Sequence, residues 1–109
     1  QKSMQVAELV QKLTATFPSE DKVGLLSQMR RAAVSVPSNI AEGQARHTTG
    51  EFVQFVSHSE GSVAELETPL LLSIRLAFAT ADSAAPVVSL LDEVRRMLNG
   101  LRRSLVTRH

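Results

Sequence analysis

Apolar residues recur at steps of three and four along almost the whole chain, and strict alternation over the length of a strand is hard to find. A repeat near 3.6 residues is typical of an α-helix with one buried face, whereas a half-buried strand alternates every second residue. The chain has 109 residues, the usual size of one domain. We therefore predict an all-α protein with a single domain over residues 1–109.

Prolines and capping residues divide this pattern into four predicted helices, over residues 2–16, 19–46, 50–79 and 82–107. Thr48 and Glu51 match a capping box, in which a hydroxyl and a carboxylate three residues later satisfy exposed helical amides. Pro37 predicts a kink or break in the second helix. The linkers, near residues 17–19, 46–49 and 80–85, are short and place successive helices side by side. The prediction is an up-down-up-down antiparallel four-helix bundle.

The last helix carries the clearest apolar stripe, which we expect to face the core. Its predicted inward residues are Val87, Leu90, Leu91, Val94, Met97, Leu98, Leu101 and Leu105.

No residue pattern indicates catalysis. The histidines, His47, His58 and His109, have neither a nucleophile elbow nor a glycine-rich phosphate loop beside them. The Glu-x-x-His spacing of di-iron bundles is absent, and the chain has no cysteine. We therefore predict that the protein is not an enzyme and needs no metal or cofactor.

Six polar residues form a ridge at helical spacing beside the apolar stripe of the second helix. This polar ridge consists of Gln28, Arg31, Ser35, Asn39, Glu42 and Arg46. It is either a binding strip or a structural feature, namely a solvated flank or a buried hydrogen-bond network, and we adopt the structural interpretation. Glu42 and Arg46 have the favourable order for an ion pair within one helix.

The last helix also has the one strong charge asymmetry, because its later arginines are followed by no acid. A seven-residue spacing stacks Arg95 over Arg102 and Arg96 over Arg103, in two basic rows. These four arginines are the candidate nucleic-acid contacts, although cations near a helix C-terminus also complement its dipole. The formal net charge of +1 gives no overall bias toward nucleic acid.

The half of the third helix after Pro69 has apolar residues on most of its sides, more than one buried stripe requires. Contiguous exposed apolar surface is rare on monomers, so we expect part of this segment to pack against another copy of the chain. The candidate oligomer interface is Leu71, Leu72, Leu76 and Phe78.

Several segments together resemble one known family. Residues 28–43 read Gln-Met-Arg-Arg-Ala-Ala-Val-Ser-Val-Pro-Ser-Asn-Ile-Ala-Glu-Gly, and the match extends through Glu51-Phe52, Gly61-Ser62 and Glu65-Leu66-Glu67-Thr68. With Phe17-Pro18-Ser19-Glu20 and Gly24-Leu25 before them, these segments resemble the four-helix bundle family of 23S rRNA-intervening sequence proteins, and the resemblance covers nearly the whole chain.

The resemblance implies a four-helix protomer in a ring-shaped homopentamer with no known enzymatic activity. A related protein, the accessory variability determinant of diversity-generating retroelements, is a basic pentamer that binds nucleic acid and a reverse transcriptase. We therefore expect a self-assembling scaffold or accessory protein, with weak sequence-independent nucleic-acid binding as the alternative.

The expected location is the cytoplasm. A chain without cysteine needs no oxidising compartment, and its first residues contain no apolar signal core. No apolar run approaches the roughly 20 residues that cross a bilayer, so we expect no membrane segment.

Overall fold

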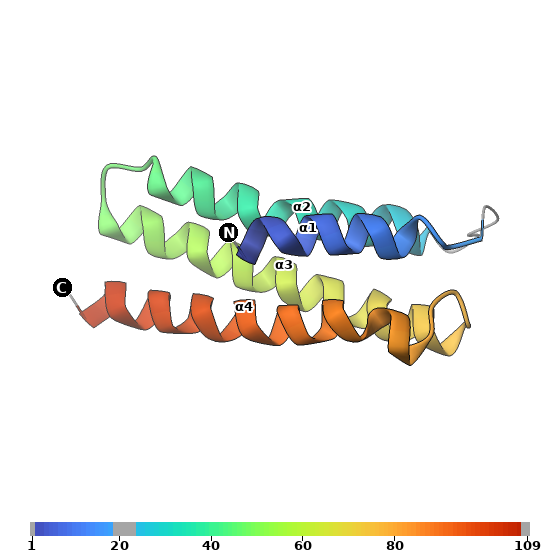
Figure 1. The fold of residues 1–109 in the computed structure, drawn as a ribbon. Coiled ribbons are helices and arrows are strands. Elements are labelled where there is room, and N and C mark those ends of the chain that lie inside the picture. The colour runs from blue at the N-terminus through green and yellow to red at the C-terminus, as the bar shows by residue number, and fades with distance from the viewer. Residues whose placement is uncertain (1, 19–23, 108–109) are drawn as a thin grey trace.

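The computed structural model describes residues 2–18 and 24–107, and these form four α-helices without a strand (Figure 1). The helices are α1 (Lys2–Thr14), α2 (Leu25–Gln44), α3 (Thr49–Arg75) and α4 (Ala81–Thr107). The predicted all-α class is confirmed.

Each helix packs against its neighbours in the order α1, α2, α3, α4 and back to α1. Within the described ranges, the diagonal pairs α1 with α3 and α2 with α4 make no close backbone approach. Successive helices run in opposite directions (Figure 1). The molecule measures 48 × 21 × 20 Å, as the predicted up-down-up-down bundle of long helices requires.

Several predicted helix ends are wrong by a few residues. Helix α1 ends at Thr14, two residues early, and α3 ends at Arg75, four residues early. The α3 end is a Schellman motif, in which the N–H of Phe78 donates to the carbonyl of Ser73 and Ala77 has a φ of 62°. Without a glycine there, the sequence carries no stop signal.

The predicted linker over residues 80–85 is also wrong, because α4 already begins at Ala81. Thr80 and Ser83 exchange backbone-to-hydroxyl hydrogen bonds of 3.0 and 2.9 Å, which caps the helix before Pro86. The cap at Thr48 is present as predicted, since its hydroxyl accepts from the N–H of Glu51 at 3.1 Å. The predicted start of the second helix at residues 19–22 lies outside the described residues.

Helix α2 continues through Pro37 to Gln44, so it does not break there. Proline cannot donate a backbone hydrogen bond. Two side chains form hydrogen bonds with backbone carbonyls near Pro37, one from α3 and one from α2. Ser59, which is fully buried on α3, donates to the carbonyl of Val36 at 2.8 Å. Asn39 donates to the carbonyl of Ser35 at 2.8 Å. The bond from Ser59 therefore links α3 to α2 at the proline, whereas the bond from Asn39 lies within α2.

Candidate interaction surfaces

The middle of the polar ridge lies along the seam between α2 and α3. The Oγ atoms of Ser35 and Ser62 are 2.7 Å apart, which links the two helices directly. Asn39 also donates to Ser35 Oγ at 2.9 Å, and Ser62 donates to the carbonyl of His58 at 3.1 Å. These residues form a hydrogen-bonded network between α2 and α3.

The two ends of the ridge differ from its middle. Arg46 forms the expected ion pair with Glu42 at 2.9 Å, and its guanidinium lies 4.7 Å from the ring centre of Phe55. At the other end, the side chains of Gln28 and Arg31 make no hydrogen bond or ion pair to any described residue. The structural interpretation therefore fits the network and the ion pair, but it leaves Gln28 and Arg31 without a role.

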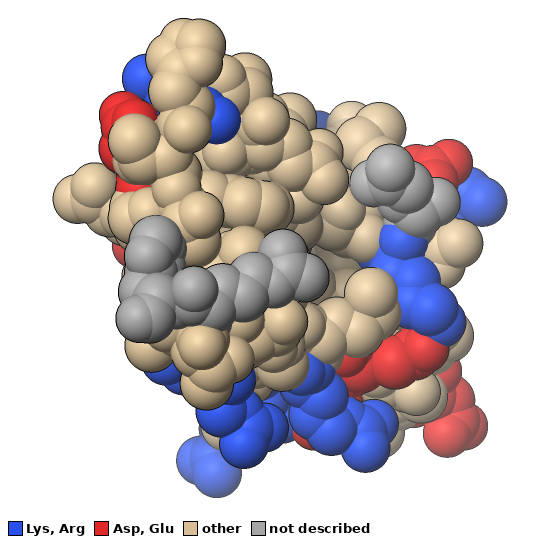
Figure 2. Space-filling view, turned by 90° about the vertical axis from the view of Figure 1, so that its left-hand side faces the viewer, with Lys and Arg blue, Asp and Glu red and all other residues tan. Residues whose placement is uncertain are grey.

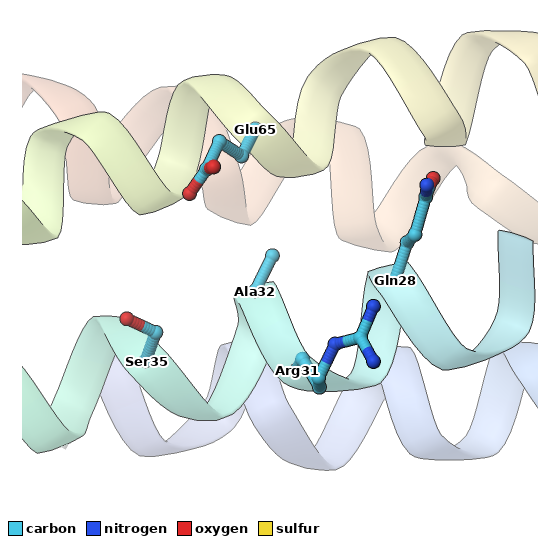
Figure 3. Close-up of a pocket in the computed structure, with 5 residues that line it drawn as sticks. All are labelled: Gln28, Arg31, Ala32, Ser35 and Glu65. Carbon is cyan, nitrogen blue, oxygen red and sulfur yellow. The ribbon is translucent and has the colours of Figure 1, made fainter.

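Those two side chains line a polar hollow between α2 and α3. Figure 3 shows Gln28, Arg31, Ala32 and Ser35 on α2, with Glu65 extending toward them from α3. A second hollow adjoins the first and shares Ser35 and Glu65 with it. Together they form one groove, the polar groove.

The two basic rows of α4 are not separated from acids in space. Arg95 forms ion pairs with Glu67 on α3 and with Asp92, and Arg96 lies 3.0 Å from Asp92. Arg102 donates to Glu60 on α3 at 2.8 Å. The sequence shows only the acids along α4 itself, so it misses the two carboxylates that α3 supplies.

Arg103 is the one candidate arginine without such a partner among the described residues.

The acidic neighbours also act on Arg95. A side-chain hydrogen bond to Asp92 and the nearby charge of Glu67 raise the pKa of Arg95, so its charge persists. Figure 2 views the end of the bundle where α4 terminates, and acidic side chains lie among the basic ones along its lower edge. Acidic neighbours therefore weaken the positive field of this surface.

The candidate oligomer interface divides into exposed and packed residues. Leu71, Leu72 and Leu76 are exposed, and Leu71 retains 55% of its accessible surface. Phe78 instead is partly buried and packs against the core, with its ring centre 5.7 Å from that of Phe17. Phe78 therefore contributes to packing within the protomer. The three leucines carry the apolar surface that is open to a partner.

Leu71 lines an apolar groove between α3 and α4, the α3–α4 groove, with a volume of about 200 Å³. Val88 lies across from it on α4 and is 50% exposed. The groove is lined by Glu67, Leu70, Leu71, Ile74, Val88 and Leu91. Leu72 and Leu76 lie outside it.

A second apolar groove lies on the other side of α4, where α1 begins. This α2–α4 groove has a volume of about 360 Å³ and is lined by Lys2, Ser3, Ile40, Val94, Met97, Leu98 and Leu101. Met97, predicted to point inward, is 53% exposed. It stands at the edge of the apolar stripe, and sequence periodicity does not separate such an edge residue from the core.

The described residues contain no group of three or more histidine, aspartate or glutamate side chains that could hold a metal. His58 is exposed, and its ring meets the Phe55 ring edge to face at 5.6 Å. Among the described helices, none combines the length and apolar character of a membrane span.

The fold and these surfaces define a class: a four-helix bundle protein with open apolar grooves on both sides of its last helix. The family model of the 23S rRNA-intervening sequence proteins matches residues 1–100. The chain belongs to this family, as its sequence segments predicted.

The chain is also similar to a crystal structure from Bacteroides thetaiotaomicron, of a protein with unknown function from the S23 ribosomal protein family. The TM-score is 0.85 at 22% identity, over 93% of this chain and 94% of that one. This likeness supports the fold. A comparison with curated proteins finds no match.

Proposed function

We propose that the protein is a non-enzymatic scaffold or accessory protein of the cytoplasm that assembles with copies of itself into a closed ring. The observation that carries this proposal is the presence of two different apolar grooves on one protomer. We propose five protomers in the ring, the number that the family resemblance implies.

The two grooves face different directions. Val88 in the α3–α4 groove and Met97 in the α2–α4 groove are nine positions apart on α4. At about 3.6 residues per turn this spacing is two and a half turns, so the side chains leave the helix on opposite sides. A neighbour at one groove therefore leaves the other groove free for a second neighbour.

Such an arrangement favours a ring over a two-fold dimer. A two-fold interface uses the same patch on both subunits, whereas a contact between two different patches repeats from copy to copy and forms a ring when the rotation between copies closes. Burying a whole leucine, valine or methionine side chain contributes roughly 1.5–3 kcal/mol. Leu71, Val88 and Met97 are each about half exposed, so each retains a substantial part of that contribution for an interface.

Sequence-independent nucleic-acid binding through Arg95, Arg96, Arg102 and Arg103 remains the second proposed function. Its support is Arg103, which has no ion pair within the described residues, together with its repetition around a ring. Repeated weak sites reinforce one another because each later site binds at a high effective concentration. Affinity that falls steeply with salt distinguishes this function from a pure scaffold.

Light scattering on the purified protein at micromolar concentration tests the assembly. We expect five times the protomer mass for the wild type and dissociation of both Leu71→Glu and Met97→Glu, because each variant would bury an unpaired charge at one contact. Val34→Glu is the matched control, since Val34 is 55% exposed on α2 and lines neither groove. A monomeric wild type rejects the proposal, and so does an intact ring in both groove variants.

A further inference from the structure

We propose that the polar groove between α2 and α3 binds a small zwitterion, an α-amino acid with a polar side chain. This binding role goes beyond assembly. The groove consists of two adjoining hollows of about 570 and 550 Å³, and each is large enough for a small molecule.

The groove holds one positive and one negative side chain on facing helices. Arg31 belongs to α2 and Glu65 to α3, and both line the first hollow (Figure 3). Neither has an ion pair with a described residue. By contrast, Arg46, Arg95, Arg96 and Arg102 all have carboxylate partners. Arg31 and Glu65 are therefore opposite charges at one hollow that do not neutralise each other through direct contact.

The space between them is open because the residue there is small. Ala32 lines the hollow beside Arg31, and its methyl group leaves room that a longer side chain would fill (Figure 3). The wall behind is fixed by the 2.7 Å contact between Ser35 and Ser62. The hollow therefore has free space above Ala32 and one wall that is held in place by a hydrogen bond.

These groups match the two ends of an amino acid. A guanidinium donates two parallel hydrogen bonds to a carboxylate, and a carboxylate accepts from an ammonium group. The ligand carboxylate would bind Arg31 and its ammonium group Glu65, with Gln28 beside them. Its polar side chain would extend toward Asn39 and His58 in the second hollow.

Other ligand classes fit less well. Glu65 repels a phosphate or a nucleic-acid backbone, and Arg31 repels a metal ion or a polyamine. No phenylalanine lines either hollow, and the one ring there, the His58 imidazole, already packs edge to face on Phe55, so a base or a sugar has little surface on which to stack. The polar groove shares no lining residue with either apolar groove, so the proposed assembly contacts do not use its residues.

Titration of the ¹⁵N-labelled full chain with L-glutamine, followed by backbone amide shifts, tests this site. We expect saturable shifts centred on residues 28–39 and 58–65. Arg31→Gln and Glu65→Gln should each weaken binding roughly tenfold, the loss expected for one charge-assisted hydrogen-bonded contact. Ala32→Leu should abolish binding by filling the hollow, while Arg103→Gln, remote from the groove, should leave it unchanged.

Two further probes keep the test independent of folding defects. N-acetyl-glutamine lacks the ammonium group and should bind roughly tenfold more weakly to the wild type. The charge-swapped Arg31→Glu, Glu65→Arg protein should regain affinity relative to the single variants, because a zwitterion can bind in the reverse direction. The absence of saturable shifts, or equal binding of N-acetyl-glutamine, would overturn the proposal.

Discussion

Gly43 on α2 lies so close to α3 that a Cβ atom built on it would be 2.8 Å from Cδ1 of Phe52. The same atom would be 2.9 Å from Cβ of Phe55, which cannot move without its backbone. The close approach of the two helices here depends on the missing side chain.

We predict that Gly43→Ala destabilises the protein by about 1 kcal/mol or more, since overpacking costs about 1–3 kcal/mol and the helix propensity of alanine recovers only part of it. Urea unfolding measures the change. Gly100→Ala is the control, because a Cβ there meets nothing within 4 Å, and it should stabilise α4 by up to about 1 kcal/mol. Equal effects at the two glycines would contradict the packing argument.

Ala77 is the described non-glycine residue with a left-handed backbone, at φ 62°. We predict that Ala77→Gly stabilises the fold by about 0.5–1 kcal/mol. The left-handed conformation costs an L-residue about 1–2 kcal/mol, and part of this gain is offset because glycine loses more conformational entropy on folding. The same substitution at the exposed Ala85 inside α4 should destabilise by about 1 kcal/mol. Thermal melts of the two variants should therefore shift in opposite directions.

The helix count and the Thr48 cap were predictable because periodicity and capping are local properties of a sequence. The end of α3 was not, because Ala77 adopts a conformation in which glycine is the usual signal. The partners of Arg95 and Arg102 were missed for a different reason. Glu67 and Glu60 lie 28 and 42 positions away and meet them only when α3 packs on α4.

The candidate interaction sites were predictable to different degrees. The leucine cluster correctly indicated exposed apolar surface at Leu71. Val88, which lines the α3–α4 groove opposite Leu71, was not among the inward residues predicted for the last helix. Glu65 shares a groove with Arg31 because α2 and α3 pack in one particular register. A single sequence shows which residues share a helix face, and packing determines which faces meet.

We predict that Asn39→Ala lowers stability by about 0.5–1 kcal/mol. The variant loses two side-chain hydrogen bonds, worth about 0.5–1.5 kcal/mol each, and regains part of this through helix propensity. Chemical unfolding checks the value, with the exposed Ser38→Ala as control. A melting temperature for Asn39→Ala no lower than that of the control would contradict the structural interpretation of the ridge.

We predict that removing the α3 carboxylates strengthens any nucleic-acid binding. Glu60→Gln with Glu67→Gln leaves Arg102 without its carboxylate partner and Arg95 with Asp92 alone. Electrophoretic titration at low salt, with a mixed-sequence duplex, should show tighter binding than the wild type. Changing Arg95, Arg96, Arg102 and Arg103 to glutamine should abolish it. A shift that survives these four changes would rule out the arginines as the contact.

The most direct test of ring assembly through two different grooves is the mass of a mixture. Leu71→Glu leaves the α2–α4 groove unaltered, and Met97→Glu leaves the α3–α4 groove unaltered. Each variant alone should be a monomer by light scattering. Mixed in equal amounts, they should form a one-to-one heterodimer, in which the unaltered groove of one variant contacts the unaltered groove of the other. The heterodimer should grow no further, because both of its remaining grooves carry a glutamate. A mixture that stays monomeric, or a single variant that still dimerises, would contradict assembly through opposite grooves.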